Sequence, residues 1–347
     1  MISKEQYGRL RTGEPVFIYT LSSGMMEARV ISYGATLVSL KVKGIDVILG
    51  YDSLQGYVDG NSSQGATIGR YANRIAEGRF AIGGEIFSLE RNEASTGCHI
   101  HGGAMGFSRQ VWELEELKDG DAPSLTLNYV SPDGDQGYPG KLDVNVTFTL
   151  TDRSLDIRYH AVTDKPTICN LTNHSYFNLA GKGDCLEHSL QIFSSEWLPV
   201  DESFIPVRIE KTEDTAFDFS LPKAIGCDIC EDDPQLTVVG GGYDHNYILG
   251  TDRSWKKAAV VFCPQTDITM TVSTDLPGIQ LYTSNMLDEP LGKNGMPLVK
   301  HQALCLETQF WPDSPNHKDY PSCSLMPGEE YDTHTEFSFT AGDTHND

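Results

Sequence analysis

The sequence predicts an all-β protein: a large antiparallel β-sandwich with few short helices. Three observations favour this fold class. Stretches in which apolar and polar residues alternate strictly recur along the chain, and an apolar period of 3.6 residues is rarely sustained over three turns. The 33 glycines and 17 prolines are spread throughout the sequence, as many turns between short strands require. Antiparallel sandwiches combine all of these features.

The clearest strands form two predicted hairpins. In residues 141–150, "KLDVNVTFTL", every second residue is apolar, and after a turn the alternation resumes in residues 155–162. Residues 78–90 contain two short strands around a Gly-Gly pair, which suits the positive φ angles of a tight loop. Residues 267–275 alternate as well. These patterns predict half-buried strands that face a common core.

The remaining segments complete the predicted organisation. Residues 53–60 suggest a short helix, residues 3–10 a frayed helix, and residues 231–242 a loop. No repeat or long linker divides the chain, so we expect one sandwich domain over residues 1–340. The polar end of the chain, residues 341–347, is expected to be a disordered tail.

Charge and cysteine usage restrict the partners and the compartment. The formal net charge of −23 repels polyanions, which argues against nucleic acid and anionic membranes as partners. The eight cysteines are scattered, and several lie in apolar runs as reduced thiols do. The sequence has no run of the roughly 20 apolar residues that a membrane helix needs, and its first residues do not resemble a secretion signal. We therefore expect a cytoplasmic protein.

One segment places a histidine where a buried strand would carry Val or Ile. Residues 170–181 read "NLTNHSYFNLAG". If this segment is a strand, one polar and aromatic face contains Asn170, Thr172, His174, Tyr176 and Asn178. Such a face suits a polyhydroxyl ligand. The alternative is a core histidine bonded to a nearby carbonyl, and the segment alone leaves both interpretations open.

A glutamate interrupts a second apolar run. Glu307 lies in the middle of "HQALCLETQFWPDSPNH", residues 301–317. Because Glu is rarely buried without a partner, Glu307 either pairs with a cation or projects into a cleft with a raised pKa. It is therefore a candidate base. The alternative is a glutamate on an edge strand that faces water.

Other polar clusters supply weaker candidates. Asn73 and Arg74 follow an apolar run and could bind sugar hydroxyls or a carboxylate, although a surface salt bridge is the simpler interpretation. The spacing of His99 and His101 predicts that both lie on one strand face, which can begin a metal site. A second group consists of turn-like or short-strand positions and an isolated C-x-x-C pair: Asp244, His245, Gln280, Cys227 and Cys230.

Taken in order, these motifs resemble those of the galactose mutarotases, or aldose 1-epimerases. The resemblance is carried by "YGATLVSL", "GRYANRIAEGRF", "HGG" followed by "GF", "SPDGDQGYPG", "LTNHSYFNLAG", "GGYDH", "LYTSN", "LETQFWPDSPNH" and "PGEEY". It extends over almost the whole chain. Many motifs in the same order are far more specific than any one of them.

The resemblance implies a fold, an activity and roles for particular residues. The fold is the galactose mutarotase-like supersandwich, and the activity is interconversion of the α- and β-anomers of free hexoses such as galactose and glucose, with no cofactor or metal. His174 would be the general acid and Glu307 the general base. The implied sugar contacts are Asn73, Arg74, His101, Asp244 and Gln280. We expect a monomer or homodimer. The family often has Asn where this chain has Cys98, next to the variable position of His99.

The residue types suit this chemistry. Opening a cyclic hemiacetal requires removal of the proton from the C1 hydroxyl and delivery of a proton to the ring oxygen, so one base and one acid suffice. We expect Glu307 to be ionised and His174 protonated at the start, each favouring the charge of the other. The rate should then depend on pH as a bell whose limbs report the coupled pair.

Four other functions compete with this one. A glycoside hydrolase would pair Glu307 with a second carboxylate such as Asp244. A cupin-like metal protein would use four ligands: His99, His101, His174 and Glu307. A hexose-6-phosphate 1-epimerase would need clustered cations, yet near the matched site only Arg70 and Arg74 stand out. A non-catalytic sugar-binding protein would not need the acid and base.

Overall fold

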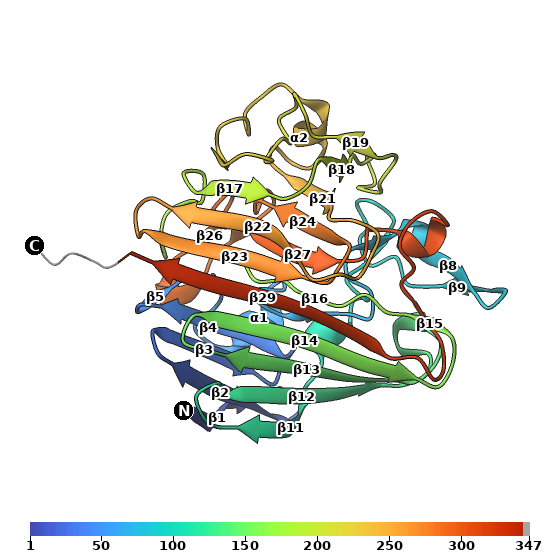
Figure 1. The fold of residues 1–347 in the computed structure, drawn as a ribbon. Coiled ribbons are helices and arrows are strands. Elements are labelled where there is room, and N and C mark those ends of the chain that lie inside the picture. The colour runs from blue at the N-terminus through green and yellow to red at the C-terminus, as the bar shows by residue number, and fades with distance from the viewer. Residues whose placement is uncertain (343–347) are drawn as a thin grey trace, which may run out of the picture.

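A nine-stranded antiparallel sheet extends through the molecule (Figure 1). The structure is a computed structural model, and it describes residues 1–342. The strand order is β11-β12-β13-β14-β29-β23-β22-β17-β20. In that order the strands span Glu113–Lys118, Ser124–Ser131, Leu142–Leu150, Ser154–Thr163, Tyr331–Ala341, Ile268–Thr274, Lys256–Cys263, Ser189–Ile192 and Lys223–Ala224.

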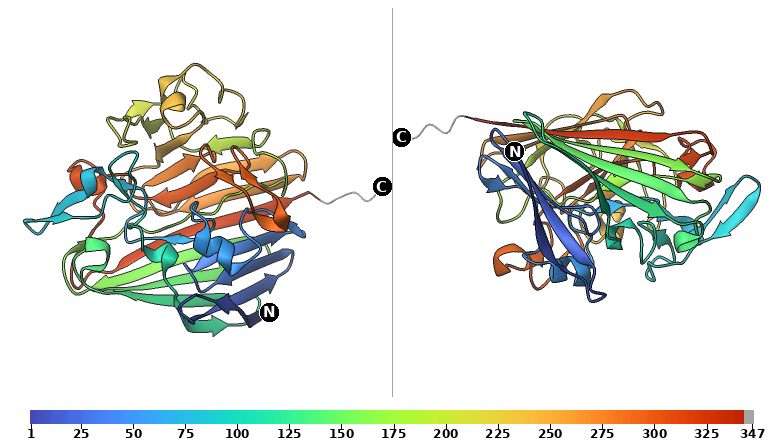
Figure 2. Two further views of the ribbon diagram at one scale, coloured as in Figure 1. Left: turned by 180° about the vertical axis from the view of Figure 1, so that it is seen from behind. Right: turned by 90° about the horizontal axis from the view of Figure 1, so that it is seen from below.

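Two five-stranded sheets pack against the large one. The N-terminal sheet contains β1 to β5, which span Ile2–Arg9, Pro15–Ser23, Met26–Ile31, Thr36–Val42 and Ile45–Asp46. The other has the order β19-β18-β21-β24-β27, and its strands span Glu210–Lys211, Glu196–Leu198, Asp244–Ile248, Gly278–Tyr282 and Cys305–Gln309. Strands β2 and β3 contact β13, and side chains of β27 meet those of β14 and β29. Figure 2 shows the large sheet along one side of the molecule.

Short pairs of strands and single helical turns connect the sheets. The paired strands are β6 Thr67–Ile68 with β16 Thr172–Asn173, β7 Arg74–Ile75 with β10 His99–Ile100, β8 Arg79–Ile82 with β9 Glu85–Ser88, β15 Thr167–Ile168 with β28 Ser324–Leu325, and β25 Asp288–Glu289 with β26 Leu298–Val299. In the described residues the α-helices are α1 Leu54–Asp59 and α2 Pro234–Val238. Single 3₁₀ turns span Ala76–Gly78, Phe107–Arg109, Asp135–Gly137, Lys293–Gly295 and Ser314–Asn316.

The predicted fold class and hairpins are confirmed. Strands β13 and β14 form the hairpin expected from their alternation, and β8 and β9 form the other around Gly83 and Gly84, with φ angles of 61° and 85°. The predicted strand at 267–275 is β23. The apolar face of β13 is buried as expected, and it consists of Leu142, Val144, Val146, Phe148 and Leu150.

Four predictions about the limits of elements had different outcomes. The helix predicted at 3–10 is wrong: this segment belongs to β1, whose backbone pairs with β2, because eight residues without an apolar stripe gain more from a sheet edge than from a helix. The short helix predicted at 53–60 is α1, which Ser53 caps. The predicted loop at 231–242 contains α2. Strand β29 ends at Ala341, the first residue of the predicted tail, and residues 343–347 lie outside the described residues.

The single strand expected at 170–181 is also wrong. Within it only Thr172–Asn173 belongs to a strand, β16. The backbone of the next residues pairs with several separate segments: the amide of His174 donates to Ala66 at 2.9 Å and that of Phe177 to Leu304 at 2.7 Å. A segment that crosses between sheets in this way cannot keep a period of two residues.

The packing of β13 yields a stability prediction. Truncating Phe148, which is completely buried, to Ala should lower the free energy of unfolding by about 3–5 kcal/mol, since a large cavity would remain. Urea unfolding of Phe148→Ala measures this. The matched control is Thr149→Ala, at the next, half-buried position, which should change it by less than about 0.5 kcal/mol. Equal effects of the two substitutions would contradict the observed orientation of the strand.

Candidate active site

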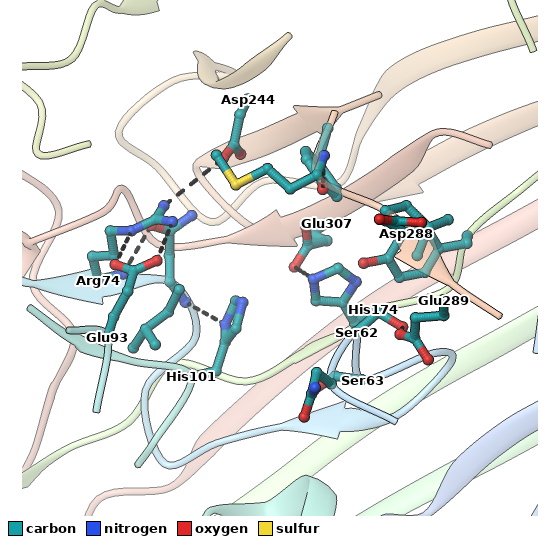
Figure 3. A pocket seen from close by; sticks show the side chains of 17 residues that line it. Ser62, Ser63, Arg74, Glu93, His101, His174, Asp244, Asp288, Glu289 and Glu307 are labelled. Atoms are coloured by element: carbon teal, nitrogen blue, oxygen red, sulfur yellow. Dashed lines mark hydrogen bonds and ion pairs between the residues drawn. The ribbon is translucent and has the colours of Figure 1, made fainter. Parts of the chain in front are cut away.

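A cavity of about 440 Å³ brings the predicted site residues together (Figure 3). It lies beside the sheet that contains β21, β24 and β27, and the loops around β6, β7 and β10 complete its wall. Of the seven predicted residues, six line it: Asn73, Arg74, His101, His174, Asp244 and Glu307. Its volume is typical of a site for a small molecule.

Glu307 is a buried carboxyl group without a hydrogen-bonded partner on one oxygen. It lies on β27, opposite Gln280 of β24, and is 3% exposed. Its Oε2 atom forms no hydrogen bond with residues 1–342 and lies 3.7 Å from Nε2 of His174. A buried polar atom normally has a partner, and the carboxyl group that lacks one here lines the cavity. The prediction that Glu307 projects into a cleft is confirmed.

Backbone bonds and aromatic packing hold His174 against this carboxyl group. The amide of His174 donates to Ala66, and its carbonyl accepts from Gly65, each at 2.9 Å. The imidazole stacks on Tyr176 with 5.0 Å between ring centroids, and Nδ1 lies 3.6 Å from Sγ of Cys305. The ring orientation is therefore fixed, with Nε2 directed at Glu307 (Figure 3).

Burial sets the protonation of the pair. It raises the pKa of Glu307 to about 8, an effect that nearby Asp244 reinforces and Arg74 opposes. Burial also lowers the pKa of His174 to about 4. At neutral pH these two shifts favour a neutral pair with its proton on Glu307. The expectation of an ionised Glu307 and a protonated His174 is wrong for this state, because desolvation of the two charges outweighs their attraction.

Arg74 is held by two carboxylates. Its Nε and one terminal nitrogen donate to the two oxygens of Glu93, both at 2.7 Å, and another nitrogen lies 3.9 Å from Asp244. Gln280 is not among the residues that line the cavity; its amide donates to Asp244 at 2.7 Å. Arg74 is therefore part of a buried network, not of the surface salt bridge that its sequence context also allowed.

Two hydrogen bonds between Asn73 and His101 orient these residues. Both residues have left-handed backbones, with φ angles of 66° and 52°. The amide of Asn73 donates to Nδ1 of His101 at 3.2 Å, and the amide of His101 donates to the carbonyl of Asn73 at 3.1 Å. Burial holds the pKa of His101 well below its usual value. The neutral ring accepts at Nδ1 and carries its hydrogen on Nε2, so it can donate to a ligand.

The predicted pairing of His99 with His101 on one strand face is wrong. Strand β10 ends at Ile100, and the left-handed backbone of His101 turns its ring away from the strand. His99 instead bonds to the carbonyl of Glu90 and the hydroxyl of Tyr138, both at 2.7 Å. These bonds occupy both ring nitrogens of His99, so the four-ligand cupin-like site is not assembled.

The polar face predicted around His174 is only partly correct. Tyr176 lines the cavity, but Asn170, Thr172 and Asn178 do not. The amide of Asn178 donates to the carbonyl of Gln302 at 2.7 Å, and Asn170 bonds to backbone atoms of Phe310. Their role is to satisfy backbone groups where the chain crosses between sheets.

Sequence patterns did not single out several lining residues. Glu93, Ser62, Asp288 and Glu289 come from loops or very short strands, and Tyr282 ends β24. None of them interrupts a periodic pattern. Tyr282 is the tyrosine of the "LYTSN" motif, and that motif was the one signal that could have identified it.

Comparison with known proteins identifies the family. Residues 18–338 match the family model of aldose 1-epimerase. The chain belongs to the aldose 1-epimerase family. It is 41% identical to galactose mutarotase of Mus musculus over 98% of each chain. It is 38% identical to aldose 1-epimerase of Escherichia coli K12, covering 95% of this chain and 96% of that protein.

Solved structures in the family share the architecture. The crystal structure of galactose 1-epimerase from Lactobacillus acidophilus matches with a TM-score of 0.88 and 30% identity over 99% of each chain. That of an aldose epimerase homologue from Caenorhabditis elegans matches with a TM-score of 0.85 and 28% identity, covering 93% of this chain and 98% of that one. In residues 1–342 no helix has the length and apolar character to cross a membrane.

The Arg74 network yields a second stability prediction. Replacing Glu93 with Gln should lower the free energy of unfolding by about 3 kcal/mol, because it removes the bidentate partner of a buried guanidinium while Asp244 remains nearby. Urea unfolding at neutral pH measures the change. Glu90→Gln, on the exposed side of the same loop, should have no comparable effect. A Glu93→Gln protein as stable as wild type would contradict the network.

Proposed function

We propose that this protein interconverts the α- and β-anomers of free hexoses such as D-galactose and D-glucose, with Glu307 as general base and His174 as general acid. The observation that carries the proposal is the unpartnered Oε2 of Glu307, 3.7 Å from Nε2 of His174 in a cavity of small-molecule size. Membership of the aldose 1-epimerase family supports the reaction type.

The proposed cycle moves two protons. Glu307 removes the proton from the C1 hydroxyl while His174 delivers one to the ring oxygen, and the C1–O5 bond breaks to give the open-chain aldehyde. After rotation about C1–C2 the carbonyl presents its other face. The two transfers then run in reverse and close the ring as the opposite anomer. Each positioned proton transfer contributes roughly 10²–10⁴-fold to the rate.

The number of protons that the pair holds is compatible with these roles. Between about pH 4 and pH 8 the pair holds one proton. Moving it from Glu307 to His174 creates the reactive base and acid without changing the charge of the site. A sugar hydroxyl that donates to Oε2 of Glu307 stabilises the carboxylate, as does the nearby positive charge of Arg74.

The other lining residues are proposed to hold the sugar. Asn73, Arg74, His101 and Asp244 present an amide, a guanidinium, an imidazole N–H and a carboxylate, which together can donate to and accept from hydroxyl groups. Gln280, which the resemblance implied as a sugar contact, donates to Asp244 and is proposed to orient that carboxylate.

The charges of the cavity favour an unphosphorylated sugar. Of the described residues that line it, Arg74 alone carries a permanent positive charge, and Glu93 already occupies it. Asp288 and Glu289 lie at the far end of the cavity. These carboxylates would repel a phosphate group, which argues against a hexose-6-phosphate substrate. A purely sugar-binding protein would not need a buried, unpartnered carboxyl group, whose desolvation costs stability.

We further propose a cytoplasmic monomer or homodimer. All eight cysteines are free, and six of them are buried, as is usual for proteins in a reducing compartment. Gel filtration with light scattering would determine the oligomeric state.

Polarimetry tests the proposed catalytic pair. Freshly dissolved α-D-galactose and α-D-glucose should equilibrate much faster with wild type than in buffer, and Glu307→Gln and His174→Asn should each lower the rate by about 10²–10⁴-fold. Circular dichroism should verify that both variants are folded. Wild-type equilibration no faster than buffer would contradict the epimerase activity. Folded variants with wild-type rates would contradict only the assigned roles.

The pKa values predict a bell-shaped dependence of kcat/KM on pH. The one-proton form of the pair is lost to a second proton as the pH falls towards about 4, and it loses its proton as the pH rises through about 8. Initial polarimetric rates, corrected for the buffer reaction, measure the two limbs. Circular dichroism at each pH separates titration from unfolding. A rate that is constant from pH 4 to pH 10 would contradict a catalytic pair.

A further inference from the structure

Cys305 places a thiol directly beside the acid and base. Cys305 and Glu307 are two residues apart on β27, so both side chains project from the same face of the strand. Sγ of Cys305 lies 3.6 Å from Nδ1 of His174, and Oε2 of Glu307 lies 3.7 Å from Nε2. One ligand atom from each of the three residues lies within 4.8 Å of the other two. The proposed reaction uses only two of these groups.

We propose that His174, Cys305 and Glu307 form an inhibitory binding site for a soft divalent metal ion such as Zn²⁺ or Cd²⁺. An imidazole, a thiolate and a carboxylate are the groups that bind zinc in proteins, and the thiolate selects for soft ions. Zinc bonds of ~2.0–2.3 Å place tetrahedral ligands roughly 3.3–3.8 Å apart. Ligand atoms up to 4.8 Å apart must therefore approach one another by up to about 1.5 Å. Because backbone bonds and stacking fix the imidazole, the side chains of Cys305 and Glu307 would make this movement.

Two independent features of the cavity favour a cation there. The first is Oε2 of Glu307, a buried carboxyl oxygen that has no partner in residues 1–342. The second is the charge of the lining: besides Arg74 it contains four further acidic residues, which are Glu93, Asp244, Asp288 and Glu289. A cleft lined by one sign of charge concentrates counter-ions, and the net charge of −23 acts in the same direction.

Metal binding would block catalysis directly. Bonds form from the metal to sulfur, nitrogen and oxygen, the S–H proton of Cys305 and the proton shared by Glu307 and His174 pass to solvent, and no atom changes oxidation state. The imidazole gives one metal ion a single nitrogen, and coordination through Nε2, the nitrogen that faces Glu307, would take up the lone pairs proposed to remove and deliver protons. Two of the three ligands, His174 and Glu307, line the cavity, so the metal and the sugar would compete for them.

Cadmium titration tests the site without relying on activity. The thiolate-to-Cd²⁺ charge-transfer absorbance is followed in a Cys227→Ser/Cys230→Ser background, because this exposed C-x-x-C pair can itself bind metal. We expect one equivalent to bind, loss of the signal on adding Cys305→Ser, and no loss on adding Cys263→Ser, a buried cysteine on β22. A signal that Cys305→Ser leaves unchanged would overturn the proposal.

Excess D-galactose provides a second test that needs no substitution at position 305. It should displace Cd²⁺ from the Cys227→Ser/Cys230→Ser protein, and insensitivity to the sugar would overturn the site even if Cys305→Ser fails to fold.

Inhibition of epimerisation is the third test, and this test rests on the proposed function. ZnCl₂ should inhibit the wild type competitively with galactose and reversibly on adding a chelator. With each rate normalised to that of the same protein without metal, Cys305→Ser should raise the half-inhibitory concentration at least about tenfold. Equal sensitivity of the two proteins would overturn the proposal. Cadmium binding by a protein that does not epimerise hexoses would instead overturn only the proposed function.

Discussion

The site depends on the burial of one carboxyl group in a strand without a hydrogen-bonded partner. Strand β27 is buried along its whole length, and its register with β24 places Glu307 opposite Gln280, while the register of β24 with β21 places Asp244 opposite Tyr282. The sheet thus fixes the proposed base and one of the proposed sugar ligands on the two strands that flank β24, in register with positions of β24 that are two residues apart. Burying such a group is costly, so the surrounding sheets must over-determine its position. The nine-stranded sheet does this by packing β14 and β29 against the other face of β27.

The fold was largely predictable because its signal is periodic. Strands such as β13, with a buried apolar face on every second residue, follow directly from the sequence, and Glu307 was visible because it interrupts such a pattern. Segments without a constant partner were not predictable. The residues around His174 bond in turn to Ala66, Leu304 and other distant segments. The sequence there therefore has no regular alternation of apolar and polar residues. The same reasoning explains why Glu93 was missed: it holds Arg74 from a loop whose position only tertiary contacts determine.

The protonation of Glu307 and His174, the proposed catalytic pair, shows where residue types alone mislead. A glutamate and a histidine in contact suggest an ion pair, and in water that would be their state. In this cavity each charge is desolvated, which raises the pKa of Glu307 and lowers that of His174 until the neutral pair is favoured. Because transfer of one proton within the pair leaves the net charge unchanged, the reactive form stays accessible once a ligand hydroxyl and Arg74 stabilise the carboxylate.

The same arrangement also makes the site suited to binding a metal ion that would inhibit it. A site that transfers protons needs free lone pairs on nitrogen and oxygen atoms that lie close together. In this water-poor and negatively charged cleft, the same lone pairs are suited to binding a metal ion. A nonpolar residue at position 305 would leave only two protein ligands, too few for tight binding of zinc. The thiol supplies the third ligand because strand alternation directs it to the same face as Glu307. A sugar in the cavity would compete with the metal for the two ligands that line it, His174 and Glu307. The susceptibility of the enzyme to soft metals therefore follows from the alternation of β27, and it is greatest when substrate is scarce.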